Sequence, residues 1–155
     1  MKNNGFDDFD VGIMNCLQDN ARMTSEVMAA EVGLSATACQ RRMKRLRDCG
    51  AIAEEVAVIS PDIVGGRITM LVQVALKHGG GDAVDAFKRD MLKIPEVQQC
   101  YYVMGDFDFI LIVTARDIAE YDQLTRRVFF PNRAIARFQT TVAMENVKTS
   151  LRIPI

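Results

Sequence analysis

The sequence lacks any long hydrophobic run, which excludes a membrane-spanning helix. In 155 residues the longest purely apolar stretch is residues 109–113, whereas a helix that crosses a bilayer needs about 18 such residues or more. The first ten residues, MKNNGFDDFD, are polar and acidic and do not resemble a secretory signal. We therefore expect a protein of the cytoplasm.

Clustered cysteine and histidine are also missing. The four cysteines lie far apart and form no CxxC pair, so neither a disulfide framework nor a structural zinc site is expected. The single histidine, His78, precedes three glycines, but the Gly-Lys-Ser/Thr of a phosphate-binding loop does not follow them. These absences predict no metal, no cofactor and no catalytic residues.

Positive charge is concentrated in one short segment. The formal net charge of the whole chain is −1, which by itself argues against a nucleic-acid partner. Between Arg41 and Arg47, however, five of seven residues are Arg or Lys. Such a cluster on one element can bind phosphate even when its domain is acidic overall.

The first sixty residues have the spacing of three helices. Acidic residues begin a helix at about residue 8, and its apolar positions, Phe9, Ile13, Cys16 and Leu17, have helical spacing. A second helix begins near Thr24 or Ser25 and ends at Gly33, and Ser35 can cap a third over 36–49. Residues 51–59 are strand-like, and Pro61 with Gly65-Gly66 marks a linker. We predict a helix-turn-helix domain over 1–60 and a linker over 61–66.

Residues 67–155 alternate between strand and helix patterns. The predicted order is β-α-β-β-α-β, with a tight turn at Gly105-Asp106 between the second and third strands. This is the order of a ferredoxin-like domain, so the predicted class is α+β. The strands are expected at 68–77, 97–104, 107–115 and 138–147, and the helices from Asp82 to before Pro95 and from Asp117 to Phe129.

The third predicted helix is the candidate DNA reader. In a helix-turn-helix, the second helix of the motif enters the major groove and uses its N-terminal part. Polar side chains for base edges or phosphates are Ser35, Thr37, Gln40 and Arg41, and cations for the flanking backbone are Arg42, Lys44 and Arg45. Five phosphate contacts predict a log–log salt slope of about −4 to −5 per domain. The alternative is a helical hairpin with a solvated basic face.

Both halves resemble the Lrp/AsnC (feast/famine) family of prokaryotic transcription regulators. The matching segments are FDDFDVGIMNCLQDNAR, VGLSATACQRRMKRLRDCGAI, GDFDFILIV and FQTTVAMENVK. The resemblance implies a DNA-binding helix-turn-helix, a ferredoxin-like effector and assembly domain, and dimers that can form octamers. Ala36 and Ala38 stand where family members usually have proline, and Phe107 and Phe109 lack the hydroxyl of the tyrosine often found in this segment.

A candidate effector site lies at the turn between the second and third strands of the second domain. Backbone groups and carboxylates there can bind the ammonium of an amino acid. The resemblance implies that this turn and the last strand meet a neighbouring subunit to enclose the effector. The candidate residues are Gly105, Asp106, Asp108 and Thr140. The alternative is an ordinary hairpin turn beside an ordinary strand threonine.

The favoured function is a sequence-specific DNA-binding transcription regulator, not an enzyme. Its expected partners are double-stranded DNA, a small-molecule effector and further copies of the chain, as a dimer or an octamer. The resemblance implies that the effector is an amino acid. Two alternatives remain. One is an architectural DNA-binding protein without an effector, and the other is an enzyme similar to tetrapyrrole decarboxylases, for which His78 is the one available histidine.

Overall fold

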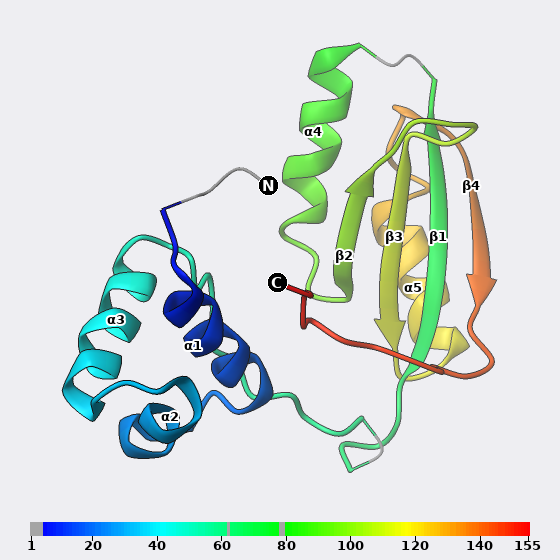
Figure 1. Cartoon of the computed structure of the whole chain (residues 1–155). Helices are drawn as coiled ribbons and strands as arrows, with labels where there is room; N and C mark the ends of the chain where they lie inside the picture. The colour runs from blue at the N-terminus through cyan, green and yellow to red at the C-terminus, as the bar shows by residue number, and fades with distance from the viewer. Residues whose placement is uncertain (1–4, 62, 78–79) are drawn as a thin grey trace. The chain divides into compact units, whose positions relative to one another are not determined.

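The computed structural model describes residues 5–61, 63–77 and 80–155 (Figure 1). The chain forms two compact units. The first consists of Met1–Val58 and Ser150–Ile155, and the second of Ile59–Thr149. The predictions that concern His78 lie outside the described residues. No helix among the described residues has the length and apolar character needed to cross a bilayer.

Three helices make up most of the first unit: α1 (Asp8–Asp19), α2 (Ser25–Val32) and α3 (Ala36–Asp48). The side chains of Asp7, Thr24 and Ser35 accept hydrogen bonds from the first turns of these helices, as expected of N-caps. Gly33 ends α2 in the left-handed conformation, with φ of 72°, which glycine adopts without steric cost. The sharp turn into α3 follows from this residue.

The helices of the first unit enclose a small core. Its fully or nearly fully buried members come from all three helices: Ile13, Leu17, Met28, Cys39 and Leu46. Phe9, the first residue of the apolar series in the sequence, is 42% exposed and lies outside this core. The buried residue of that turn is Asp10, which is 1% exposed. The helical spacing of the apolar residues did not predict that this acidic residue is the buried one.

The last six residues of the chain belong to the first unit. The side-chain amide of Gln18 on α1 donates to the backbone carbonyl of Ile153 at 3.0 Å and accepts from its N–H at 2.7 Å. Arg152 forms an ion pair with Asp19 beside this pair of hydrogen bonds. The C-terminal segment is thereby attached to the last turn of α1.

The second unit is an antiparallel sheet with two helices. Its strands are β1 (Ile68–Leu76), β2 (Val97–Tyr102), β3 (Phe109–Ala115) and β4 (Ile135–Val142), and its helices are α4 (Gly81–Met91) and α5 (Ile118–Val128). The strand order is β2-β3-β1-β4, with every neighbouring pair antiparallel. This is the ferredoxin-like arrangement, so the predicted fold class, helix-turn-helix followed by a ferredoxin-like domain, is confirmed.

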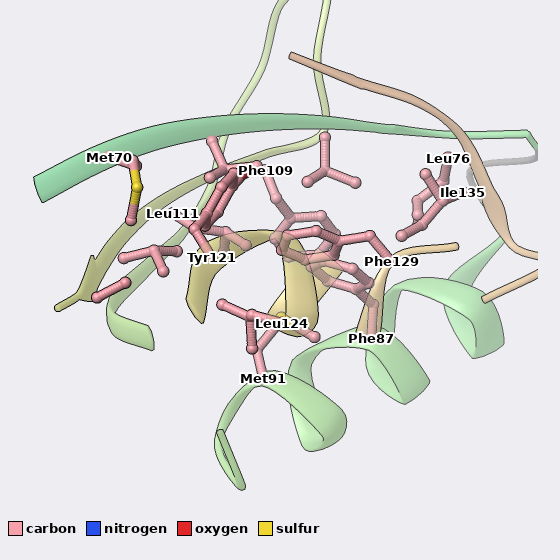
Figure 2. Close-up of a cluster of buried hydrophobic side chains, with 14 of the residues drawn as sticks. Met70, Leu76, Phe87, Met91, Phe109, Leu111, Tyr121, Leu124, Phe129 and Ile135 are labelled. Carbon is pink, nitrogen blue, oxygen red and sulfur yellow. The ribbon is translucent and has the colours of Figure 1, made fainter. Parts of the chain in front are cut away.

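One face of the sheet packs against both helices (Figures 1 and 2). Alternate residues of β1 point to this face, as strand geometry requires. Phe87 of α4 stacks against Phe109 of β3 with 4.5 Å between ring centroids, and Tyr121 and Leu124 bring α5 to the same core. The buried residues of the central strands are Met70, Val72, Val74, Leu76, Phe109, Leu111, Val113 and Ala115.

Three predictions of local structure, one before the second unit and two within it, are wrong. Residues 51–59 form no strand, and the tight turn is a six-residue loop over 103–108. The last strand covers 135–142 and not 138–147, because it pairs with β1, from Leu76 opposite Ile135 to Met70 opposite Val142. The pairing with β1 therefore sets its limits, while the apolar pattern in the sequence continues beyond them.

Candidate functional site

One exposed face of α3 carries polar side chains. Thr37, Gln40, Arg41 and Lys44 are spaced by three or four residues, which places them on one side of a helix, and all four are exposed. Cys39 and Leu46 bury the opposite side. Ser35 caps the helix by accepting from the N–H of Ala38 at 3.2 Å. The predicted base-reading residues therefore share the exposed N-terminal half of α3.

Gln40 is held by the first turn of α2. Its amide donates to the hydroxyl of Ser25 at 3.1 Å, and that hydroxyl donates to Glu26 at 3.1 Å. Ser25 is buried, so the contact joins the two helices of the motif at their facing surfaces. One of the two Gln40 amide donors is thus used within the protein.

Arg42 and Arg45 bind the buried carboxylate of Asp10. Arg42 donates to one oxygen at 2.8 Å, and Arg45 pairs with the other. Burial raises the pKa of Asp10, but hydrogen bonds from Arg42, the Asp7 backbone and Arg45 outweigh this effect and hold its pKa below the usual value. The sequence showed these arginines as part of a basic cluster, but it did not show that they share one acid.

The remaining cations of the segment differ in their partners. Lys44 pairs with Asp48 at 2.7 Å, and both side chains are largely exposed. Arg47 donates to both oxygens of Glu55, at 3.0 and 2.8 Å. Among the ion pairs formed by the described residues, none includes Arg41. Arg41 is therefore the exposed cation of α3 without an acidic partner in that part of the chain.

Three of the four candidate effector residues, Gly105, Asp106 and Asp108, lie in the loop 103–108. Asp108 is fixed there, since its N–H donates to the carbonyl of Val74 at 2.9 Å and its carboxylate accepts from the N–H of Leu76 at 2.7 Å. Gly105 and Asp106 are exposed. The structure thus brings three of the four candidates together, with Asp108 bonded to the end of β1.

Arg137 of β4 lies beside this loop and was missed in the sequence analysis. Its guanidinium stacks over the ring of Phe107, 4.7 Å from the centroid, and donates to the backbone carbonyl of Asp106 at 3.3 Å. Thirty-one residues separate Arg137 from Asp106, so local spacing gives no signal of their proximity. The positive charge beside the loop 103–108 is thus supplied by Arg137 of β4.

Thr140, the fourth candidate, is placed differently. It lies opposite Val72 in the pairing of β4 with β1, and Val72 points to the helix-covered face. Its hydroxyl shares a hydrogen bond with the hydroxyl of Tyr121 on α5. Burial raises the pKa of Tyr121, and the bond to Thr140 partly offsets that rise. Thr140 is therefore not grouped with Arg137, which is exposed.

No group of three or more His, Cys, Asp or Glu side chains within residues 5–61, 63–77 and 80–155 could hold a metal ion. In the two regions, Asp10 binds Arg42 and Arg45, and the carboxylate of Asp108 accepts from the N–H of Leu76. The chemistry available at both regions is ionic and hydrogen-bonded recognition.

Comparison with known proteins gives matches along nearly the whole chain. Residues 6–47 match the AsnC-type helix-turn-helix domain, and residues 69–153 match the Lrp/AsnC ligand binding domain. An uncharacterised HTH-type transcriptional regulator of Sinorhizobium fredii is 50% identical over 94% of this chain and 86% of its own length. The leucine-responsive regulatory protein of Escherichia coli K12 is 32% identical over 96% of this chain and 91% of its own.

Solved structures match as well. An AsnC family transcriptional regulator from Agrobacterium tumefaciens has a TM-score of 0.89 at 30% identity, with 96% of this chain and 97% of that chain covered. A transcriptional regulator of Neisseria meningitidis, in complex with L-Met, has a TM-score of 0.88 at 26% identity and covers 96% of both chains. With both domain models matched in order, this chain belongs to the Lrp/AsnC family of transcriptional regulators and carries that family's DNA-binding helix-turn-helix and ligand-binding domains.

Proposed function

We propose that the protein binds specific DNA sequences through α3 and that a small molecule bound at the second unit regulates this binding. The exposed polar face of α3 carries the proposal. Ser35, Thr37, Gln40 and Arg41 supply donors and acceptors for base edges, and Lys44 lies beside them for the phosphate backbone. The sequence also predicts backbone contacts for Arg42 and Arg45, whose guanidinium groups bind Asp10.

The protein acts in the cytoplasm as a homo-oligomer, a dimer or an assembly of dimers up to an octamer. The sheet face away from the helices supports association, because Leu71 and Tyr101 are exposed there and exposed apolar surface favours protein contacts. Two DNA-binding domains then read half-sites about one helical turn apart, roughly 10 bp, or a multiple of it.

Replacing Arg41 with alanine tests the DNA proposal. A bidentate contact from an arginine to a base is worth about 1–3 kcal/mol, so Arg41→Ala should weaken specific binding by roughly ten- to a hundredfold per half-site. Selection of bound duplexes from a random pool gives the target, and titration at fixed salt gives the affinity. Lys93→Ala, on the exposed turn after α4, is the matched control. Unchanged affinity and base preference for Arg41→Ala would remove α3 as the reader.

The effector is an amino acid held at the loop 103–108. An amino-acid zwitterion needs partners of both charges, and this region offers Asp106 and Asp108 together with the guanidinium of Arg137. The regulator of Neisseria meningitidis was solved in complex with L-Met, which supports an amino acid as the ligand class. Thr140, the fourth candidate, is not part of this proposal, because its hydroxyl bonds to Tyr121 on the helix-covered side of the sheet.

Replacing Arg137 with alanine tests the effector site. Hydrogen bonds to charged groups are worth about 1.5–3 kcal/mol, so the Kd of a bound amino acid should rise by roughly tenfold or more. A thermal-shift screen of the twenty amino acids finds the ligand, and a titration compares wild type with Arg137→Ala. Arg133→Ala, an exposed arginine just before β4, is the control. Equal titrations for wild type and Arg137→Ala would exclude Arg137 from the site.

The same screen separates the rival functions. An architectural DNA-binding protein without an effector gives a flat response to all twenty amino acids while it still binds duplex DNA. The similar proteins with names are transcriptional regulators. This supports a regulator and not an enzyme similar to tetrapyrrole decarboxylases. Incubation with haem-like precursors tests that enzyme, and a change in their absorbance would support it.

A further inference from the structure

A carboxylate buried beneath α3 accepts hydrogen bonds from three donors. Asp10 is 1% exposed, and its oxygens accept from the N–H of Asp7 at 3.1 Å, from Arg42 at 2.8 Å and from Arg45. In return, the N–H of Asp10 donates to the side chain of Asp7 at 2.9 Å. This reciprocal capping box fixes Asp10 at the start of α1, so the carboxylate is a rigid anchor for the two arginines.

Arg42 contacts three residues at the start of α1: Asp7, Phe9 and Asp10. Its Nη1 atom donates to Asp7 at 2.9 Å as well as to Asp10, and its guanidinium lies 5.5 Å from the ring centroid of Phe9. Only 21% of its side chain is exposed. The charge of Arg42 is therefore paired with Asp7 and Asp10, its guanidinium lies over the ring of Phe9, and most of its side-chain surface is buried.

The four charged groups of this cluster cancel one another. Asp7 and Asp10 carry two negative charges, while Arg42 and Arg45 carry two positive ones. Separating a buried ion pair leaves an unpaired charge in a site with little water, which costs far more than separating an exposed pair. The exposed pairs of Lys44 with Asp48 and of Arg47 with Glu55 can open for a phosphate at little cost. Opening either pair to Asp10 instead takes a partner from a carboxylate that is 1% exposed, even though the Arg45 side chain is itself 51% exposed.

The positions of the cations around α3 agree with this difference between the residues paired to Asp10 and the exposed ones. Arg42 and Arg45 are three residues apart, and both turn toward α1. Arg41 and Lys44 are likewise three apart and lie with Thr37 on the exposed face. Arg41 and Arg42 are adjacent in the sequence, but Arg41 is exposed and Arg42 is paired with acids at the start of α1.

We infer that Asp10 is a positioning residue that withholds Arg42 and Arg45 from DNA and uses them to orient α3, so that phosphate binding by this helix depends on Arg41, Lys44 and Arg47. The inference rests on the proposed DNA binding and refines it. Three available cations give a salt slope of about −3 per domain, whereas five give about −4 to −5.

The neighbouring arginines provide a matched test. Binding to a short mixed-sequence duplex is measured over a range of salt concentrations for wild type, Arg41→Gln and Arg42→Gln. Arg41→Gln should reduce the magnitude of the slope by about 0.9 per domain, while Arg42→Gln should leave it unchanged. An equal reduction by both variants overturns the inference. Failure of the wild type to bind any duplex at low salt would instead overturn the proposed function.

Asp10→Asn provides a second test that does not depend on the folding of Arg42→Gln. Freed from the carboxylate, the two arginines become available to phosphates, so the slope should steepen by up to about 1.8 per domain. Discrimination between a selected duplex and the mixed-sequence duplex should fall, because α3 loses its anchor. Asp8→Asn, an exposed acid of the same turn, makes the same change in net charge and should leave the slope and the discrimination unchanged. An unaltered slope and discrimination in folded Asp10→Asn would contradict the inference.

Discussion

Replacing Leu46 with alanine should lower the free energy of unfolding of the first unit by about 2–5 kcal/mol. Leu46 is fully buried on α3 among residues from α1 and α2, and its removal leaves a cavity that the surrounding helices fill only in part. A small domain has only about 5–15 kcal/mol of stability in total. The variant should therefore lose much of its DNA binding near the growth temperature, through unfolding and not through a lost contact.

Chemical denaturation followed by circular dichroism measures this loss, and duplex binding at two temperatures relates it to function. Val27→Ala is the control, because Val27 on α2 is 53% exposed and exposed substitutions usually change stability by less than about 0.5 kcal/mol. A Leu46→Ala protein as stable as the wild type would show that this core does not hold α3 in place.

Phe109→Ala should destabilise the second unit by about 3–5 kcal/mol. The ring of Phe109 is fully buried and stacks against Phe87 and Tyr102, with centroids 4.5 and 5.2 Å away. Phe109 also directly follows Asp108, whose carboxylate binds the N–H of Leu76 at the end of β1. A cavity at this point should loosen the loop 103–108 and weaken the amino-acid response.

The thermal unfolding of the second unit and the amino-acid titration measure these two effects. Leu92→Ala is the control, since Leu92 follows α4 and is 86% exposed. The prediction for the ligand response is contradicted if Phe109→Ala is destabilised yet binds the amino acid with the wild-type Kd. The loop would then hold its shape independently of the ring beneath it.

Local signals were sufficient to predict most elements of the fold. Capping residues and Gly33 placed α2 and α3 within about one residue, because a helix end is determined by groups near it in sequence. The limits of β4 could not be predicted in this way, since they depend on pairing with β1. Residues 51–59 have a strand pattern, but no strand of this chain pairs with them among the described residues.

The candidate sites were predictable as regions but not as contacts. Spacing placed Thr37, Gln40 and Arg41 on an exposed helix face, and the structure has them there. The burial of Asp10 depends on arginines 32 and 35 residues later, and the place of Arg137 depends on a loop 31 residues earlier. Pairings over such distances arise from tertiary packing, which a single sequence does not display.

The attachment of the C-terminal segment to α1 has a practical consequence for dissecting the protein. Gln18 and Asp19 obtain partners from Ile153 and Arg152, so a fragment that stops at Val58 is an incomplete helix-turn-helix unit. A premature stop codon just before Ser150 likewise removes part of the DNA-reading module while it spares every strand of the sheet. Removal of residues 150–155 is thus expected to affect the first unit, although these residues follow the last strand in the sequence.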